Sequence, residues 1–69
     1  MARFFALRVD GFERYAEDNV VWVAGQPYLV SSARSVRADS RAVPVPGART
    51  LARARRVAVR VLESETIRR

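Results

Sequence analysis

The chain contains no cysteine, no histidine and no lysine. Without cysteine and histidine, disulfides, zinc fingers and catalysis by a thiol or an imidazole are excluded. Without lysine there is no amine to form a Schiff base. No apolar run approaches the roughly 18 residues that a membrane span requires. We therefore expect a protein that is not an enzyme, holds no cofactor or metal, and does not span a membrane.

The chain is also short, with 69 residues, which predicts one small domain over residues 1–69. A domain of this size buries only about 60% of the surface that its unfolded chain exposes. Leucine, isoleucine, valine and phenylalanine total 19 residues, enough to predict a folded chain rather than a disordered one. Because no disulfide or metal stabilises it, oligomerisation or docking into a larger assembly is the remaining common source of stability.

Charge is distributed unevenly along the chain. Thirteen arginines oppose seven acidic residues, which gives a net charge of +6, yet residues 1–33 carry −1 and residues 34–69 carry +7. Codon bias explains why every basic residue is arginine, but it does not choose where the charges lie. The basic half predicts contact with phosphates or with an acidic protein surface, whereas the alternative is a charged face that keeps a small protein in solution. The candidate contacts are Arg34, Arg37, Arg41, Arg49, Arg53, Arg56 and Arg60.

The first half of the chain has the pattern of strands. Residues 3–9 alternate apolar and less apolar positions, and Asp10-Gly11 is a turn signal, so we expect a hairpin over 3–16. Residues 12–16 also fit one helical turn. Residues 20–24 are β-branched and aromatic, and a turn at Gly25 precedes an apolar return, which predicts a second hairpin over 20–32. We expect a mainly β fold, either a small antiparallel sheet or an SH3-like barrel.

The second half is harder to assign. Residues 33–42 are polar, and Ser32 is a suitable cap for a short helix there. Residues 43–47, Val-Pro-Val-Pro-Gly, predict a proline-rich connector or a sheet edge, because proline lacks the donor that a central strand needs.

Two periodicities compete near the C-terminus. Val57, Val59 and Val61 alternate with more polar residues, which favours a strand near 56–63. The alternative is an α+β fold with an amphipathic helix at 48–62. Such a helix places Arg49, Arg53, Arg56 and Arg60 in one stripe, opposite Leu51, Ala54, Ala58, Val61 and Leu62.

The aromatic residues raise the question of what covers the sheet. Phe4 and Phe5 are adjacent, so they point to opposite faces of a strand, and Trp22 points away from its two valine neighbours. Two apolar faces favour a closed barrel or a protein interface, while packing on both sides within the monomer is the alternative. The predicted interface residues are Phe4, Phe5, Trp22 and Tyr28.

The acidic residues are the only other candidates for chemistry. Asp10, Glu13, Glu17 and Asp18 lie close in sequence, but their spacing matches no calcium loop and no histidine assists them. Ser31 and Ser32 have no histidine to act as a base. We interpret the acidic residues as surface charge or as partners for the basic half of a neighbouring subunit.

The sequence favours a structural or interaction subunit of a larger assembly, such as a virus or phage particle, with other subunits or copies of itself as partners. The alternative is a small nucleic-acid-binding module that makes sequence-independent phosphate contacts. Base stacking is less supported, because all six aromatic residues lie outside the basic half. The apolar N-terminal run is too short for a signal peptide, so we expect a cytoplasmic protein or one assembled there.

Overall fold

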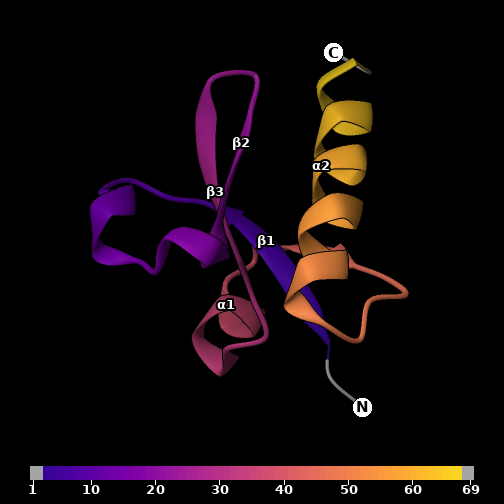
Figure 1. Cartoon of the computed structure of the whole chain (residues 1–69), viewed down its shortest axis with the longest axis horizontal. Helices are drawn as coiled ribbons and strands as arrows, with labels where there is room; N and C mark the ends of the chain where they lie inside the picture. Colours follow the sequence, from indigo (N-terminus) through magenta and orange to yellow (C-terminus); the bar gives the residue numbers. More distant parts are fainter. Residues whose placement is uncertain (1–2, 68–69) are drawn as a thin grey trace.

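A computed structural model describes the backbone of residues 3–67 and the side chains up to residue 65. Four strands form one antiparallel sheet in the order β2-β3-β1-β4 (Figure 1). The strands are β1 (Phe4–Arg8), β2 (Val20–Val23), β3 (Gln26–Ser31) and β4 (Val43–Val45). Two α-helices, α1 (Arg34–Ala38) and α2 (Leu51–Ile67), and two 3₁₀ helices, η1 (Phe12–Arg14) and η2 (Glu17–Asn19), complete the fold. The antiparallel sheet is confirmed, but with 41% helix and 29% strand the fold is α+β, so the prediction of a mainly β fold holds only in part. The sheet is open, so the predicted barrel is wrong.

The hairpin predicted over 20–32 is present as β2 and β3. Val23 pairs with Gln26, and the two residues between them form the turn. Ala24 has φ 52° and Gly25 has φ 75°, so both lie in the left-handed region. Positive φ at both central residues is the geometry of a type I′ turn, whose twist matches that of the flanking strands.

The hairpin predicted over 3–16 is wrong. β1 pairs with β3, for example Leu7 with Leu29, and with β4, for example Phe4 with Val45. The turn signal at Gly11 does operate, since this residue has φ 67°, but the chain then enters η1 instead of a return strand. The longer strand β3 occupies the place beside β1, which leaves the polar segment after Gly11 at the surface.

The C-terminal strand predicted near 56–63 is also wrong, and the alternative helix is present as α2. Thr50 begins it, because its Oγ1 accepts a hydrogen bond from the backbone N–H of Arg53 at 3.3 Å. The many alanine and arginine residues of this segment favour a helix and outweigh three valines. Ala54 and Ala58 are fully buried, and their small side chains let α2 lie close to the sheet.

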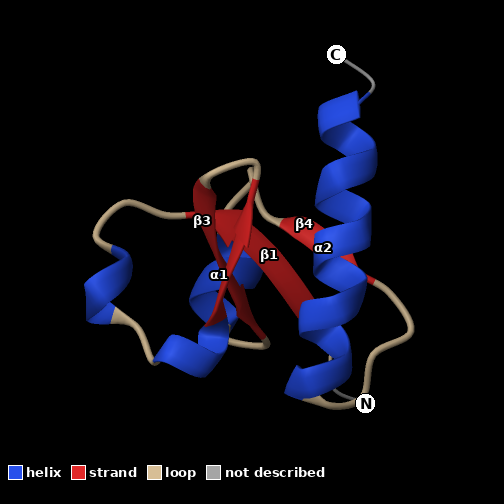
Figure 2. Ribbon diagram, turned by 45° about the horizontal axis from the view of Figure 1, so that its top comes forward, coloured by secondary structure: helices blue, strands red, loops and turns tan. Residues whose placement is uncertain are grey.

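Both faces of the sheet are covered within the monomer (Figure 2). On one face, α2 packs over Phe4, Ala6, Val30 and their neighbours to form the larger core. On the other face, α1 contributes Val36 to a smaller core with Val9 and Leu29. Packing on both sides within the monomer therefore explains the adjacent phenylalanines. The predicted serine cap of α1 is absent: Ala33 occupies the cap position, and Ser31 Oγ accepts its N–H at 2.9 Å.

The proline-rich segment forms a sheet edge, which was one of the two predictions for it. Pro44 lies opposite Phe5 in β4, between two residues that face β1. Since the backbone groups of an antiparallel strand alternate between its two sides, Pro44 is the residue of Val43–Val45 that faces outward. It has no N–H, so the outer edge of β4 offers no donor over these three residues.

Candidate functional site

The four arginines of the predicted helical stripe lie on the solvent side of α2. Arg49, just before the helix, and Arg53, Arg56 and Arg60 within it are all exposed, and we call them the arginine face. The opposite side of the helix is buried against the sheet through Ala54, Ala58 and Leu62. At 1.5 Å per residue, the part of the arginine face within the helix, from Arg53 to Arg60, is about 10 Å long. The side chains of α2 and of Arg49 before it therefore present four cations without disturbing the core.

The other predicted arginine contacts lie elsewhere. Arg34 and Arg37 belong to α1, which covers the face of the sheet opposite to α2. The seven arginines therefore form at least two separate groups rather than one basic surface.

Arg41 is already paired. Its Nη2 lies 3.1 Å from Asp39 Oδ2, its Nε donates to Oδ1 at 3.2 Å, and its backbone N–H donates to Oδ1 at 2.8 Å. These hydrogen bonds hold the pKa of Asp39 below its ordinary value and raise the pKa of Arg41. The pair closes the loop between α1 and β4, so Arg41 is less suited to a partner than the arginine face.

The most distinctive surface is a cup beside β2. Its volume is about 510 Å³, and it gathers aromatic and charged side chains from η1, β2 and α2. We call it the aromatic cup, and its lining residues are Phe12, Glu13, Tyr15, Glu17, Val20, Trp22 and Arg55. Trp22 is 53% exposed, Phe12 41% and Tyr15 38%. These are the large hydrophobic residues that the described part of the chain leaves exposed, and all three lie in this cup.

The local structure explains why the cup exists. Trp22 lies between the buried Val21 and Val23, so the alternation of the strand turns its ring away from the main core. The ring of Phe12 meets it edge to face, with the ring centres 4.9 Å apart. Glu13 follows Phe12 in η1, and Glu17 begins η2, so that both acidic residues line the cup with the aromatic ones.

Charge in the cup is incompletely balanced. Among the described residues no ion pair involves Glu13 or Glu17. Arg55 reaches the cup from α2, and its Nε is buried without a hydrogen-bond partner in the described structure. A buried donor without an acceptor is unusual in folded proteins and costs free energy. The isolated chain therefore presents a surface whose polar groups are not all satisfied.

The predicted interface residues have different surroundings. Trp22 lies in the aromatic cup, whereas Phe4, at 9% exposed, lies in the core below α2. Tyr28 is half-buried and packs against the same core, and Phe5 packs against the smaller core. Phe4 therefore contributes mainly to the core, although together with Phe5 it also lines a hollow of about 580 Å³ beside β4.

Sequence reasoning missed Phe12, Tyr15 and Arg55 as parts of one site. The available signal was an aromatic pair, Phe12 and Tyr15, in an acidic stretch that fits one helical turn as well as a return strand.

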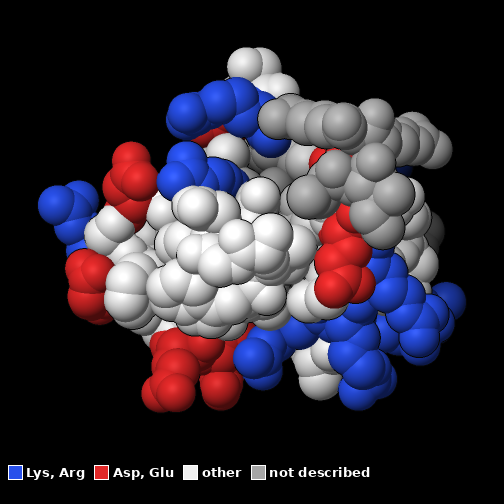
Figure 3. All heavy atoms as spheres, turned by 90° about the horizontal axis from the view of Figure 1, so that it is seen from above, with Lys and Arg blue, Asp and Glu red and all other residues white. Residues whose placement is uncertain are grey.

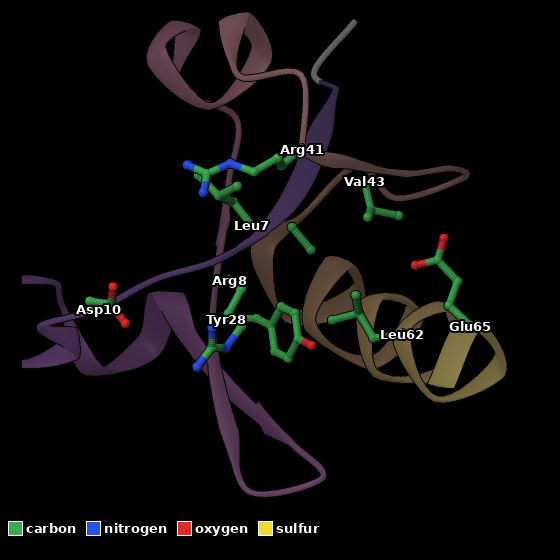
Figure 4. A pocket seen from close by; sticks show the side chains of 9 residues that line it. Leu7, Arg8, Asp10, Tyr28, Arg41, Val43, Leu62 and Glu65 are labelled. Carbon is green, nitrogen blue, oxygen red and sulfur yellow. The ribbon is translucent and has the colours of Figure 1, made fainter. Parts of the chain in front are cut away.

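A second hollow, of about 410 Å³, lies where β1 passes the C-terminal part of α2 (Figure 4). Tyr28 of β3 and Leu62 of α2 lie side by side in it, and Glu65 is at its rim. The guanidinium of Arg8 donates to Gln26 Oε1 from Nε at 2.9 Å and from Nη2 at 2.5 Å. The lining of this hollow combines both charges with apolar groups, and it contains no nucleophile beside a base.

Within the described residues, no group of three or more acidic side chains is placed to hold a metal ion, and no helix is long and apolar enough to cross a membrane. No protein-family model matches the chain, no curated protein is similar to it, and no solved structure matches its fold. The function must therefore be argued from the surfaces themselves.

Proposed function

We propose that this chain is a non-enzymatic interaction subunit that docks into a larger assembly through the aromatic cup and the arginine face. The observation that carries the proposal is the exposure of Trp22, Phe12 and Tyr15 together in one hollow. Two cores already hold the other large apolar side chains of the described sheet and helices. Exposed aromatic residues gathered in one place are typical of protein contact surfaces.

The charges around the cup support docking rather than internal packing. On the face seen in Figure 3, acidic side chains border an uncharged central area on the left and below, and a group of arginines lies at the lower right, although arginines also lie at the left and above the area and acidic atoms on its right. Complementary charges of this kind guide partners into register and suppress wrong ones. Aromatic rings at the centre with a charged rim are the common anatomy of an interface.

The proposal is tested by the size of the complex in which the chain is found in a native extract. A native extract of the source cells is fractionated by size, and the chain is detected by a small tag. We expect it in a fraction far larger than its monomer. The variant Trp22→Ala shifts to the monomer fraction, while the control Arg34→Gln with Arg37→Gln on α1 stays in the large fraction. A wild-type chain found at monomer size contradicts the proposal.

A second function, sequence-independent binding of nucleic acid, is favoured by the arginine face alone. Four exposed arginines along one helix are suited to phosphates, and guanidinium groups bind them well. If all four contact duplex DNA, the logarithm of the binding constant falls with the logarithm of salt with a slope of about −3.6. The variant Arg56→Glu with Arg60→Glu abolishes such binding, and Trp22→Ala leaves it intact. A slope near zero excludes this function.

A further inference from the structure

We propose that the aromatic cup of one copy receives the arginine face of a second copy, so that the chain associates head to tail. This inference rests on the proposed function and names its partner. It is carried by the chemistry of the cup, the placement of the arginine face, and the presence of two distinct surfaces in one chain.

The cup has the chemistry of a cation receptor. The face of an aromatic ring attracts a guanidinium group through its quadrupole, most strongly for tryptophan. Trp22 is the most exposed of the three aromatic residues, and its contact with Phe12 is edge to face. Glu13 and Glu17 supply two carboxylates at the same hollow. Aromatic faces beside carboxylates therefore select a cationic side chain over an apolar or anionic one.

The cup's own cation does not fill this role. Arg55 lines the cup, yet no ion pair with either glutamate exists among the described residues, and its Nε lacks an acceptor. One arginine against two glutamates also leaves the lining with a net negative charge. An incoming surface with further cations is thus favoured.

The arginine face supplies the matching cations. Arg56 and Arg60 lie one helical turn apart and are exposed, and among the described residues neither takes part in an ion pair. Side chains four residues apart in a helix are neighbours on its surface. Two adjacent guanidinium groups can therefore meet two carboxylates carried by successive 3₁₀ helices. Arg53 is less free, because its Nε donates to Gly47 O at 3.4 Å.

The two surfaces are distinct, although they adjoin at α2, where Arg55 of the cup precedes Arg56 of the arginine face. The arginine face lies on the side of α2 that points away from the sheet, whereas the cup lies beside β2 and includes a residue from the flank of the helix. Head-to-tail association requires that one copy uses both surfaces at once. A contact between two different surfaces is heterologous, and it builds a ring or an open filament rather than a closed dimer.

Two variants, each with one surface removed, test this geometry. The cup variant is Trp22→Ala with Glu13→Gln and Glu17→Gln, and the face variant is Arg56→Gln with Arg60→Gln. All five positions are exposed, so both variants keep the buried core. We use neutral glutamine because reversed charges on both surfaces could attract each other and restore a second contact. The control is Arg34→Gln with Arg37→Gln, which removes the same charge from α1.

Sedimentation at low salt, up to the millimolar range, gives the first readout. We expect the wild type and the control to form species larger than a dimer as concentration rises, and each surface variant to stay monomeric. An equimolar mixture of the two variants forms a dimer and nothing larger, because only one cup and one arginine face remain in each pair. Added salt dissociates these species, since exposed charges are screened.

Fluorescence gives a second readout that identifies the surface. Trp22 is the only tryptophan of the chain, so the cup variant has none and the mixture reports solely on the intact cup. We expect the tryptophan emission to move to shorter wavelength on mixing, and circular dichroism to show unchanged helix content. If the cup variant is unfolded, Glu13→Gln with Glu17→Gln alone replaces it.

Three outcomes overturn the inference. A wild type that stays monomeric at every concentration excludes self-association, while the native fractionation still tests docking to another partner. If the wild type associates but the cup variant and the face variant do not associate with each other, then other surfaces make the contact. A mixture that forms long species shows that the contact is not head to tail between these two surfaces.

Discussion

The rings of Phe12 and Trp22 meet edge to face, at an interplanar angle of 73°, although one belongs to a 3₁₀ helix and the other to an edge strand. This contact holds the η1 segment beside β2 and forms the floor of the aromatic cup before any partner arrives. A preformed surface loses less conformational entropy on binding than one that must be ordered first.

The first prediction separates a docking residue from a folding residue. Trp22 is 53% exposed, so Trp22→Ala removes the ring contact and only the buried part of the side chain, and we expect the free energy of unfolding to fall by about 1 to 2 kcal/mol. Val30→Ala removes a side chain that is 0% exposed, so we expect a loss of about 2 to 3 kcal/mol. Urea unfolding measures both. Equal losses would show that Trp22 is part of the core rather than of a docking surface.

The second prediction concerns the close approach of α2 to the sheet. Ala58 is fully buried between them, so Ala58→Leu overpacks the contact and we expect a loss of about 1 to 3 kcal/mol. Ala52→Leu changes the same residue type on the exposed side of the helix, where leucine has room. We expect it to alter stability by less than about 0.5 kcal/mol. Thermal unfolding of the two variants gives the comparison, and similar losses would contradict the packing described for α2.

The third prediction uses the type I′ turn. Ala24 has φ 52°, a conformation that costs a residue with a Cβ about 1 kcal/mol and that asparagine adopts more readily. Ala24→Asn creates the Asn-Gly pair favoured in such turns, so we expect stability to rise by up to about 1 kcal/mol. Gly25→Ala changes the next residue, at φ 75°, and should lower stability. A destabilised Ala24→Asn variant would mean that the turn has another geometry in solution.

The fourth prediction concerns acid. The hydrogen bonds from Arg41 lower the pKa of Asp39 from its ordinary value of 3.8. A carboxyl whose pKa is lower in the folded state stabilises the fold above the unfolded pKa, and this contribution is lost as pH falls through the folded pKa. The pair thus acts at neutral pH and is lost below pH 3.8. NMR titration should show a higher Asp39 pKa in Arg41→Gln than in the wild type, and equal values would exclude the pairing.

Some elements could be predicted from the sequence because one local signal dominated. Val20 to Ser31 formed a hairpin, since β-branched residues flank a turn with glycine, and Pro44 marked a sheet edge, since it lacks a donor. The strand predicted near residues 56–63 was based on the alternation of Val57, Val59 and Val61. That alternation also fits one side of a helix and its flanks. The buried Ala54 and Ala58 decide between the two, but their packing depends on a sheet that is distant in sequence.

The candidate site was harder to predict than the fold. Trp22 was identified from strand alternation, but its neighbours in the cup come from η1, η2 and α2. The hairpin predicted over residues 3–16 would have placed Phe12 and Tyr15 in a strand. Arg55 interrupts the apolar side of α2, and nothing in the sequence joins it to residues some forty positions earlier. Long-range pairing of β1 with β3 creates the cup, and local periodicity does not contain that information.

The proline at the edge of β4 gives the sheet two unlike borders. Its β2 border carries ordinary backbone donors and acceptors at Trp22, whereas its β4 border lacks a donor at Pro44. In an amyloid fibril, each strand pairs through its backbone with the strand above it and with the strand below it. A folded molecule of this chain can add a strand at its β2 border, but its β4 border lacks one of the donors that the next strand would need. We therefore expect further strands to add less readily at the β4 border than at the β2 border, even at the high local concentration that an assembly creates.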